Sequence, residues 1–203
     1  MIETLLLYLR IIGVVLLMSC LSPGPDARPA GLAAELAAIS GELRIVIQKS
    51  RNVLTVYKGM TPVKSYWAAF GKGYRQGDKR RKGDKRTPEG HFYICSMNHS
   101  DRFYKFMGIS YPGIAHAEEG MRRGDISYAE YLAIWNAIAG QQQPPWDTRL
   151  GGAIGIHGRT QREAITRVPD PANWTEGCIA LNNPDVDELF SIASLGTPVT
   201  IIP

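Results

Sequence analysis

Residues 173–181 read Asn-Trp-Thr-Glu-Gly-Cys-Ile-Ala-Leu, and they place Cys178, one of only three cysteines in the 203-residue chain, directly after a glycine. A thiol at such a position has three possible roles: a nucleophile, one half of a disulfide, or a buried side chain. A free thiol has a pKa near ~8.5 and is mostly protonated at neutral pH, so a nucleophilic cysteine needs a base within reach. The residues that accompany Cys178 therefore decide between these roles.

His157 is the histidine best placed to be that base. It directly follows the short apolar run 153–156 and is followed by Gly158, where the backbone can turn tightly. At this position, the end of a predicted strand, the His157 side chain can point away from the sheet. The other histidines, His91, His99 and His116, have no comparable setting. A lone histidine is usually structural, but His157 precedes Cys178 by 21 residues and both lie beside a glycine. The pair predicts an acyl-transfer site, in which the imidazole activates the thiol.

At these residues the sequence resembles a known family, the L,D-transpeptidases of the YkuD type. The family signature is a histidine followed, further along, by Ser or Thr, His, Gly and Cys. Here His157 is followed by seventeen residues and then by Thr-Glu-Gly-Cys at 175–178. Three further blocks resemble the family in the same order, at residues 54–57, 85–92 and 151–158. The resemblance extends over about residues 43–203.

The resemblance implies a mechanism and a set of roles. Cys178 would be acylated by a peptidoglycan stem tetrapeptide, with release of the terminal D-alanine, and the acyl group would pass to an amine. His157 would be the base, oriented by the backbone carbonyl of Gly158. Backbone N–H groups at Gly177 and Cys178 would hold the oxyanion. Neither a metal nor a cofactor is implied, and carbapenem-type inhibitors are expected to acylate the same cysteine.

Two positions depart from the family pattern. The residue before the glycine is often His in the family and is Glu176 here, and the second residue after the cysteine is Ala180 rather than Arg or Asn. The stretch resembles the YafK-like branch of the family. Thr175, Glu176 and Arg159 are the candidate substrate-binding residues. For Glu176, contact with a diaminopimelate amine and simple exposure to solvent are both open, and Arg159 is either a ligand for a carboxylate or a surface residue.

Three functions are therefore open. The first is a cysteine acyltransferase that acts on peptidoglycan stem peptides through a Cys178 thioester. The second is the same site used hydrolytically, as an L,D-carboxypeptidase or amidase. The third is a non-catalytic wall-binding lipoprotein in which Cys95 and Cys178 form a disulfide.

The first twenty residues differ in kind from the rest. After Arg10 comes a short apolar run that ends in Leu-Met-Ser-Cys at 17–20, which resembles a lipobox with Cys20 as the lipidated residue. A bilayer-spanning helix needs roughly 20 apolar residues, and this run has about half that number. The segment 1–20 predicts export to the periplasm or cell envelope, with the membrane contacted only through this N-terminal lipid or signal anchor. An uncleaved anchor or a simple cleaved signal is the alternative.

Composition fits an exported, water-exposed domain. The chain is 44% hydrophobic and 21% charged, as in globular proteins, and carries a formal net charge of +4. A basic exported protein suits an anionic envelope surface, although charge alone is weak evidence. No nucleic-acid partner is expected.

The pattern of elements predicts a β-rich α+β domain at residues 43–203, preceded by a linker and lead-in helix at 21–42. The family resemblance implies a sandwich-like catalytic domain with helical insertions. Strands are expected at 44–48, 53–57, 63–70, 91–95, 153–156 and 199–202. One helix should start after a Ser127 capping box, and another should start at an Asn183 cap and end at Gly196.

The helix that starts after Ser127 carries an apolar stripe that is expected to face the core: Tyr128, Tyr131, Leu132, Trp135, Ile138 and Ala139. Residues 71–86 contain eight Lys or Arg side chains and are called the basic loop below. Such a run is usually a solvated loop, and its functional alternative is docking of acidic groups.

Overall fold

The computed structural model describes residues 31–159 and 173–203. The predicted export segment with Cys20, and residues 21–30 of the predicted linker and lead-in helix, lie outside the described residues. Within the described ranges, no helix is long and apolar enough to cross a membrane. Residues 32–203 form one compact unit.

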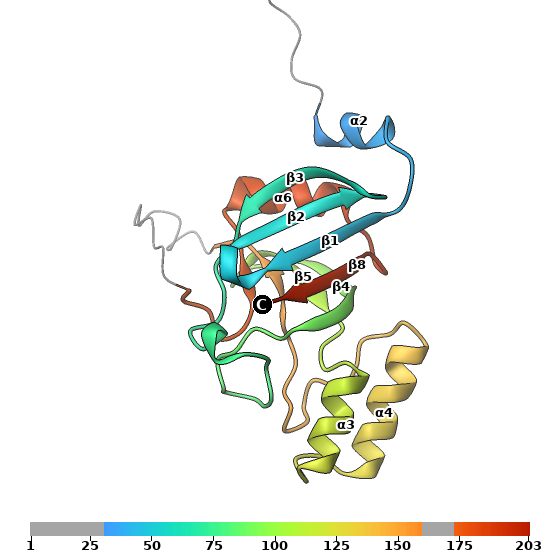
Figure 1. Ribbon diagram of the computed structural model, residues 1–203, viewed down its shortest axis with the longest axis vertical. Coiled ribbons are helices and arrows are strands. Elements are labelled where there is room, and N and C mark those ends of the chain that lie inside the picture. Colours follow the sequence, from blue (N-terminus) through green and yellow to red (C-terminus); the bar gives the residue numbers. More distant parts are fainter. Residues whose placement is uncertain (1–30, 160–172) are drawn as a thin grey trace, which may run out of the picture. The chain divides into compact units, whose positions relative to one another are not determined.

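The chain forms eight strands and four α-helices within the described residues (Figure 1). The strands are β1 (Leu43–Gln48), β2 (Val53–Lys58), β3 (Thr61–Trp67), β4 (Gly90–Ser100), β5 (Tyr104–Ile109), β6 (Gly155–His157), β7 (Ile179–Ala180) and β8 (Pro198–Ile202). The helices are α2 (Leu32–Ala37), α3 (Ile114–Arg122), α4 (Tyr128–Ala139) and α6 (Asn183–Ile192), with 3-10 turns η1 (Lys49–Arg51) and η2 (Tyr74–Gln76).

The strands form one mixed sheet in the order β3-β2-β1-β8-β4-β5-β6-β7. The pairs β1–β8 and β6–β7 are parallel, and the others are antiparallel. β3 and β7 are the two edge strands of this order. The segment that follows β3 nevertheless contacts β7 and the residues before it, because Ala69 bridges Ala180 and Gly71 bridges Thr175. The curled sheet is therefore closed on itself at these two bridges, and the predicted β-rich α+β class is confirmed.

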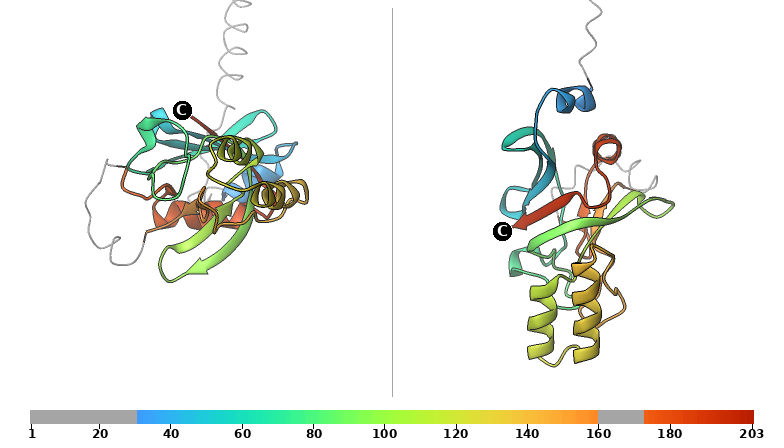
Figure 2. Two further views of the ribbon diagram at one scale, coloured as in Figure 1. Left: turned by 90° about the horizontal axis from the view of Figure 1, so that it is seen from below. Right: turned by 90° about the vertical axis from the view of Figure 1, so that its right-hand side faces the viewer.

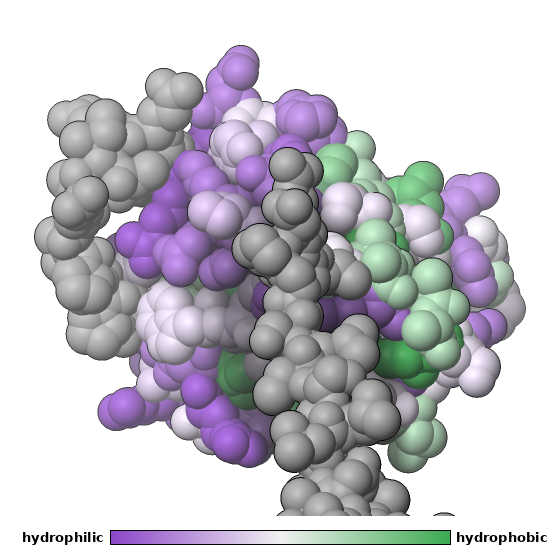
Figure 3. All heavy atoms as spheres, turned by 90° about the horizontal axis from the view of Figure 1, so that it is seen from above, coloured by the Kyte–Doolittle hydropathy of each residue, from purple (hydrophilic) through white to green (hydrophobic). Residues whose placement is uncertain are grey.

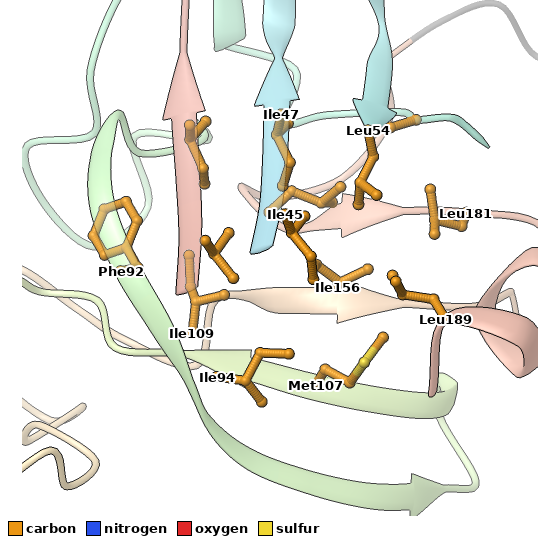
Figure 4. Packing of buried hydrophobic residues seen from close by; sticks show 14 of the residues in the cluster. Ile45, Ile47, Leu54, Phe92, Ile94, Met107, Ile109, Ile156, Leu181 and Leu189 are labelled. Carbon is orange, nitrogen blue, oxygen red and sulfur yellow. The ribbon is translucent and has the colours of Figure 1, made fainter. Parts of the chain in front are cut away.

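Alternation along the strands places the core inside the curled sheet. Ile45 and Ile47 of β1 and Leu54 and Val56 of β2 are fully buried, while their neighbours are partly exposed. Figure 4 shows Ile45, Ile47 and Leu54 near side chains from β4, β5, β6 and α6, and Val56 belongs to the same cluster. Such alternation is the period-2 pattern of a sheet with one buried face. The core thus fixes both the register of β6 and the position of α6.

The helices α3 and α4 form a hairpin beside the sheet (Figures 1 and 2). The Ser127 capping box is confirmed at the start of α4. The predicted core stripe is confirmed only in part: Tyr131 and Ile138 are partly buried against the second core cluster, whereas Tyr128, Leu132, Trp135 and Ala139 are exposed. Ile134, which was not part of the stripe, is the buried residue of α4. The helix packs against α3 and Leu150 through Ile134, Tyr131 and Ile138, in a small second cluster.

Several boundaries differ from the predictions. The N-cap of α6 is Asn182, one residue earlier than predicted, and the helix ends at Ile192 instead of Gly196. Neither α3 nor β5 was predicted. In the short helix α2, Leu32 and Leu36 are buried, and α2 contacts α6 and β3. Figure 3 shows the face on this side of the molecule, which is hydrophilic over much of its area and has hydrophobic residues gathered toward one side.

Candidate active site

The register of β6 and β7 places the two predicted catalytic residues on one face of the sheet. Ile156 pairs with Ile179 and His157 pairs with Ala180. Paired residues of parallel strands point to the same face and successive residues to opposite faces, so His157 shares a face with Ala180 and Cys178, while the two isoleucines enter the core. The strands therefore bring thiol and imidazole to neighbouring positions.

The His157 side chain is held on several sides. The residue is 1% exposed, and Nδ1 lies 2.6 Å from the backbone oxygen of Gly158. If Nδ1 donates to this carbonyl, the basic nitrogen is Nε2. The imidazole also packs against Phe103, with ring centroids 4.5 Å apart, and meets the edge of Trp174 at 6.1 Å. The predicted orienting role of Gly158 therefore has the contact that it requires.

The first residue of α6 fixes the chain after His157. Asn183 Oδ1 accepts a hydrogen bond from the backbone N–H of Arg159 at 2.7 Å. A Cβ atom added to Gly158 would lie 2.5 Å from the same oxygen, so only glycine fits there. Arg159 places its guanidinium 5.9 Å from the Trp174 ring centroid. The sequence suggested Asn183 only as a helix cap, and its contact with Arg159 was not predicted.

The Cys178 thiol lies among backbone groups of the segment before β6. Sγ donates to the oxygen of Ala153 at 3.6 Å, and Ala153 has a φ of 53°, which is uncommon for a residue with a side chain. Burial raises the pKa of this thiol, while a hydrogen bond from the Gly155 backbone and the charges of Lys79 and Arg102 lower it. Because the balance favours the neutral thiol, a base must remove its proton during attack.

Cys178 and Cys95 are both free thiols. Cys95 lies in β4, and burial raises its pKa to about 11. The disulfide that the third functional alternative required is therefore absent from the part of the chain described here.

Residues 175–178 form a tight turn, called the cysteine turn below. Thr175 is 4% exposed, and its hydroxyl donates to the Cys178 oxygen at 2.7 Å while accepting from the Gly177 N–H at 3.2 Å. Gly177 has a φ of 136°, and an added Cβ atom would lie 2.7 Å from the Arg86 oxygen. Thr175 thus holds the backbone of the turn, and Gly177 is required by both conformation and space.

Glu176 is exposed and lies between two lysines of the basic loop. Its carboxylate is 3.2 Å from Lys72 Nζ and 3.9 Å from Lys85 Nζ, and its side chain is 65% exposed. Backbone hydrogen bonds join the same segments, because Lys72 donates to Thr175 and Thr175 donates to Phe70. The basic loop therefore forms one wall of the cysteine turn, which the sequence did not indicate.

The basic loop is ordered around an internal carboxylate and is not simply a solvated run. Asp84 accepts hydrogen bonds from Lys79 Nζ at 2.7 Å and from the backbone N–H groups of Arg80, Arg81 and Arg86. Burial raises the pKa of Asp84, but these hydrogen bonds outweigh it and leave the pKa below its usual value. Lys79 is 3% exposed. The interpretation of this segment as a solvated loop is therefore wrong for Lys79, which is buried. It holds for Arg80, Arg81, Lys82 and Lys85, whose side chains are exposed.

A second buried lysine supports the end of the loop. Lys49 Nζ lies 2.5 Å from Glu89 Oε1 and donates to the backbone oxygen of Thr87. Thr87 in turn accepts the Gly71 N–H through its hydroxyl at 2.9 Å. Among the described residues, no group of three or more His, Cys, Asp or Glu side chains is arranged to hold a metal ion.

The comparisons with known proteins agree with this geometry. A family model for the L,D-transpeptidase catalytic domain, YkuD, matches residues 42–201. The helical cell shape determining protein Pgp2 from Campylobacter jejuni aligns with a TM-score of 0.55 at 17% identity, over 84% of this chain and 53% of Pgp2. Bd1075 from Bdellovibrio bacteriovorus aligns with a TM-score of 0.51 at 17% identity, over 80% of this chain and 48% of Bd1075.

The chain thus spans about half the length of these solved structures, which show a shared fold. No curated protein matches the sequence. The family model covers most of the chain, including the β6–β7 pair and the cysteine turn. The protein belongs to the YkuD family of L,D-transpeptidase catalytic domains.

Proposed function

We propose that this protein is a cysteine acyltransferase that acts on peptidoglycan stem tetrapeptides in the cell envelope. The observation that supports the proposal is the pairing of β6 with β7, which includes His157 and begins at the residue next to Cys178. The Gly158 carbonyl at Nδ1 leaves Nε2 as the nitrogen that accepts the thiol proton. Family membership supplies the expected substrate.

The reaction has two steps. In the first, His157 removes the Sγ proton, the thiolate attacks the carbonyl carbon that precedes the terminal D-alanine, and the imidazolium protonates the amine that leaves. In the second, an amine attacks the Cys178 thioester and the thiol is released. The Gly177 N–H is already used by the Thr175 hydroxyl, so the Cys178 N–H is the better of the two predicted oxyanion donors.

A mass measurement tests the nucleophile. Incubation with a carbapenem should add one inhibitor mass to the wild-type chain and to Cys95→Ser, and none to Cys178→Ala. His157→Ala should remain folded and be acylated at least a hundredfold more slowly, in the range of the loss expected for a general base. An adduct on Cys178→Ala, or full-rate acylation of His157→Ala, contradicts the assignment.

Product analysis separates transfer from hydrolysis. Purified disaccharide-tetrapeptide should be converted into cross-linked dimers, with release of D-alanine. If disaccharide-tripeptide is the sole product, water resolves the thioester and the protein is an L,D-carboxypeptidase. Export, and lipidation at Cys20, remain predictions from the sequence, and mass analysis of the mature N-terminus would test both.

A further inference from the structure

Two adjoining cavities lie on the side of the basic loop that faces the α3–α4 hairpin. They have volumes of about 410 and 730 Å³ and share Arg81, Lys82 and Asp125 as lining residues. Together they are called the basic groove. Six basic side chains line it, against three acidic ones: Arg80, Arg81, Lys82, Arg86, Arg123 and Arg149, and Asp84, Asp125 and Asp147.

Two of the three acidic side chains, Asp84 and Asp125, already bind basic groups of the protein. Asp84 is bound by Lys79 and by three backbone N–H groups, and Asp125 Oδ2 accepts from Arg123 Nε at 2.7 Å. By contrast, the side chains of Arg80, Arg81, Lys82 and Arg149 are exposed, and none lies within ion-pair distance of an acidic side chain in residues 31–159 or 173–203. Hydrogen bonds from Ser127, and to a smaller extent the charge of Arg149, lower the pKa of Glu130, so this cation is compensated in part. The groove therefore presents positive charge that the described protein does not fully neutralise.

Backbone contacts fix the positions of these cations. Arg123 Nη2 donates to the Arg80 oxygen at 3.2 Å, and the Lys82 N–H donates to the Arg149 oxygen at 2.9 Å. A Cβ atom added to Gly151 would lie 3.2 Å from the Lys82 Cα, so the two segments are in direct contact. Cations whose backbones are fixed lose less entropy on binding an anion than cations on a disordered loop.

Arg86 connects the basic groove with the cysteine turn. Its guanidinium lines the groove and donates to the Asp78 oxygen and to Gln76 Oε1, each at 3.3 Å. Its backbone oxygen lies against Gly177 on the other side of the loop. Arg86 thus contacts both the groove and the residue next to Cys178. A polymer held in the groove would lie beside the nucleophile without occupying its site.

We propose that the basic groove docks the peptidoglycan polymer through carboxylates of stem peptides other than the reacting one. This inference rests on the proposed function. Guanidinium groups match carboxylates in shape and bind them with paired hydrogen bonds. Four separate unpaired cations favour a ligand that repeats its carboxylates along a polymer, because each further contact is then intramolecular.

The test uses the Cys178→Ala chain, which cannot turn over, and measures its sedimentation with purified peptidoglycan sacculi. Neutralising three groove cations, in the combined variant Arg81→Gln, Lys82→Gln and Arg149→Gln, should weaken binding about tenfold, the sum expected for three exposed ion pairs. Binding of the parent should fall as salt rises. The matched control is Arg51→Gln, Lys58→Gln and Lys64→Gln, which removes the same charge from η1, β2 and β3. Equal weakening by both variants, or by neither, overturns the proposal.

Chemical treatment of the sacculi identifies the anion. Amidation of their carboxylates should reduce binding of the parent to the level of the groove variant. Hydrofluoric acid, which removes phosphodiester-linked polymers, should leave binding unchanged. Full binding to amidated sacculi, or loss after the acid treatment alone, overturns the assignment to stem carboxylates.

The proposed function is tested separately, since a carbapenem adduct at Cys178 needs no polymer. A wild-type chain that binds sacculi through the groove but forms no adduct contradicts the proposed function alone. A wild-type chain that forms the adduct, with a groove variant that binds sacculi as well as its parent does, contradicts the docking proposal alone.

Discussion

At the scale of single residues, the His157 imidazole is packed against two aromatic rings. Phe103 lies in the turn between β4 and β5, and Trp174 directly precedes the cysteine turn. One ring therefore comes from a segment before His157 in the sequence and the other from a segment after it. Neither ring was predicted to be part of the site. An imidazole that is fixed in orientation can receive the thiol proton without first being reoriented, which is how positioned groups lower a barrier.

We expect Phe103→Ala to slow carbapenem acylation about tenfold, because the imidazole loses its stacking partner and gains water contact. Phe103→Tyr should restore most of the rate, since it keeps the ring. Rapid-mixing mass spectrometry gives the rate, and thermal unfolding shows whether the fold survives. An unchanged rate in a folded Phe103→Ala protein would show that the ring is not needed.

The raised pKa of Cys178 has a consequence for its chemistry in the absence of substrate. Iodoacetamide reacts with the thiolate, so its rate rises with pH around the thiol pKa. Since burial raises that pKa, half-maximal reactivity of Cys178 should occur above the usual value of about 8.5. The pH dependence of the reaction rate should be measured in the Cys95→Ser variant, because Cys95 has a pKa of about 11 and would add a slow alkaline phase. A midpoint below about 7 would show a preformed thiolate.

At the scale of elements, the cysteine turn depends on one hydroxyl. Thr175 joins the Gly177 N–H to the Cys178 oxygen from a nearly buried position. Thr175→Val keeps the shape but leaves both groups without their partner, which costs about 1–3 kcal/mol of unfolding free energy. The variant should also lower the acylation rate, because the turn carries Cys178, the proposed nucleophile.

Urea unfolding and the carbapenem assay measure these two effects. Thr175→Ser is the matched control, since it retains the hydroxyl, and it should stay close to wild type in both. Equal unfolding free energies for Thr175→Val and wild type would mean that the hydroxyl does not hold the turn.

Local signals in the sequence predicted the elements that depend on neighbours along the chain. The Ser127 capping box and the strand at 44–48 depend on residues a few positions apart, and both are confirmed. The stripe on α4 was only partly right, because periodicity shows that residues share a face and not how much of that face another element covers. The contact of Lys72 with Glu176 spans more than a hundred residues and leaves no local pattern. The pair His157 and Cys178 was proposed from the glycine beside each residue and from the family resemblance, and its catalytic role stays a prediction.

At the scale of the whole molecule, the folded unit begins before the predicted catalytic domain. Leu32 and Leu36 of α2 are 6% and 7% exposed, and α2 contacts α6 and β3. A chain of residues 43–203 should therefore be about 2–3 kcal/mol less stable than residues 31–203, less than the full transfer value of two leucines because ordering α2 costs entropy. Urea unfolding of the two chains measures the difference. The double variant Leu32→Ala and Leu36→Ala in the longer chain should lose a similar amount, and coincident unfolding curves would contradict the prediction.

Closure of the sheet restricts how a peptide can approach Cys178. The segment around the nucleophile is hydrogen-bonded to its neighbours on both sides, with Ala180 joined to Ala69 on one side and Leu181 joined to His157 on the other. A strand with both neighbours in place has no free backbone row to offer, so a stem peptide cannot add to it by β-augmentation. If a peptide binds at this cysteine, its recognition must then depend on side chains and on the ends of strands. Substitutions of those side chains should therefore change the selectivity for peptides.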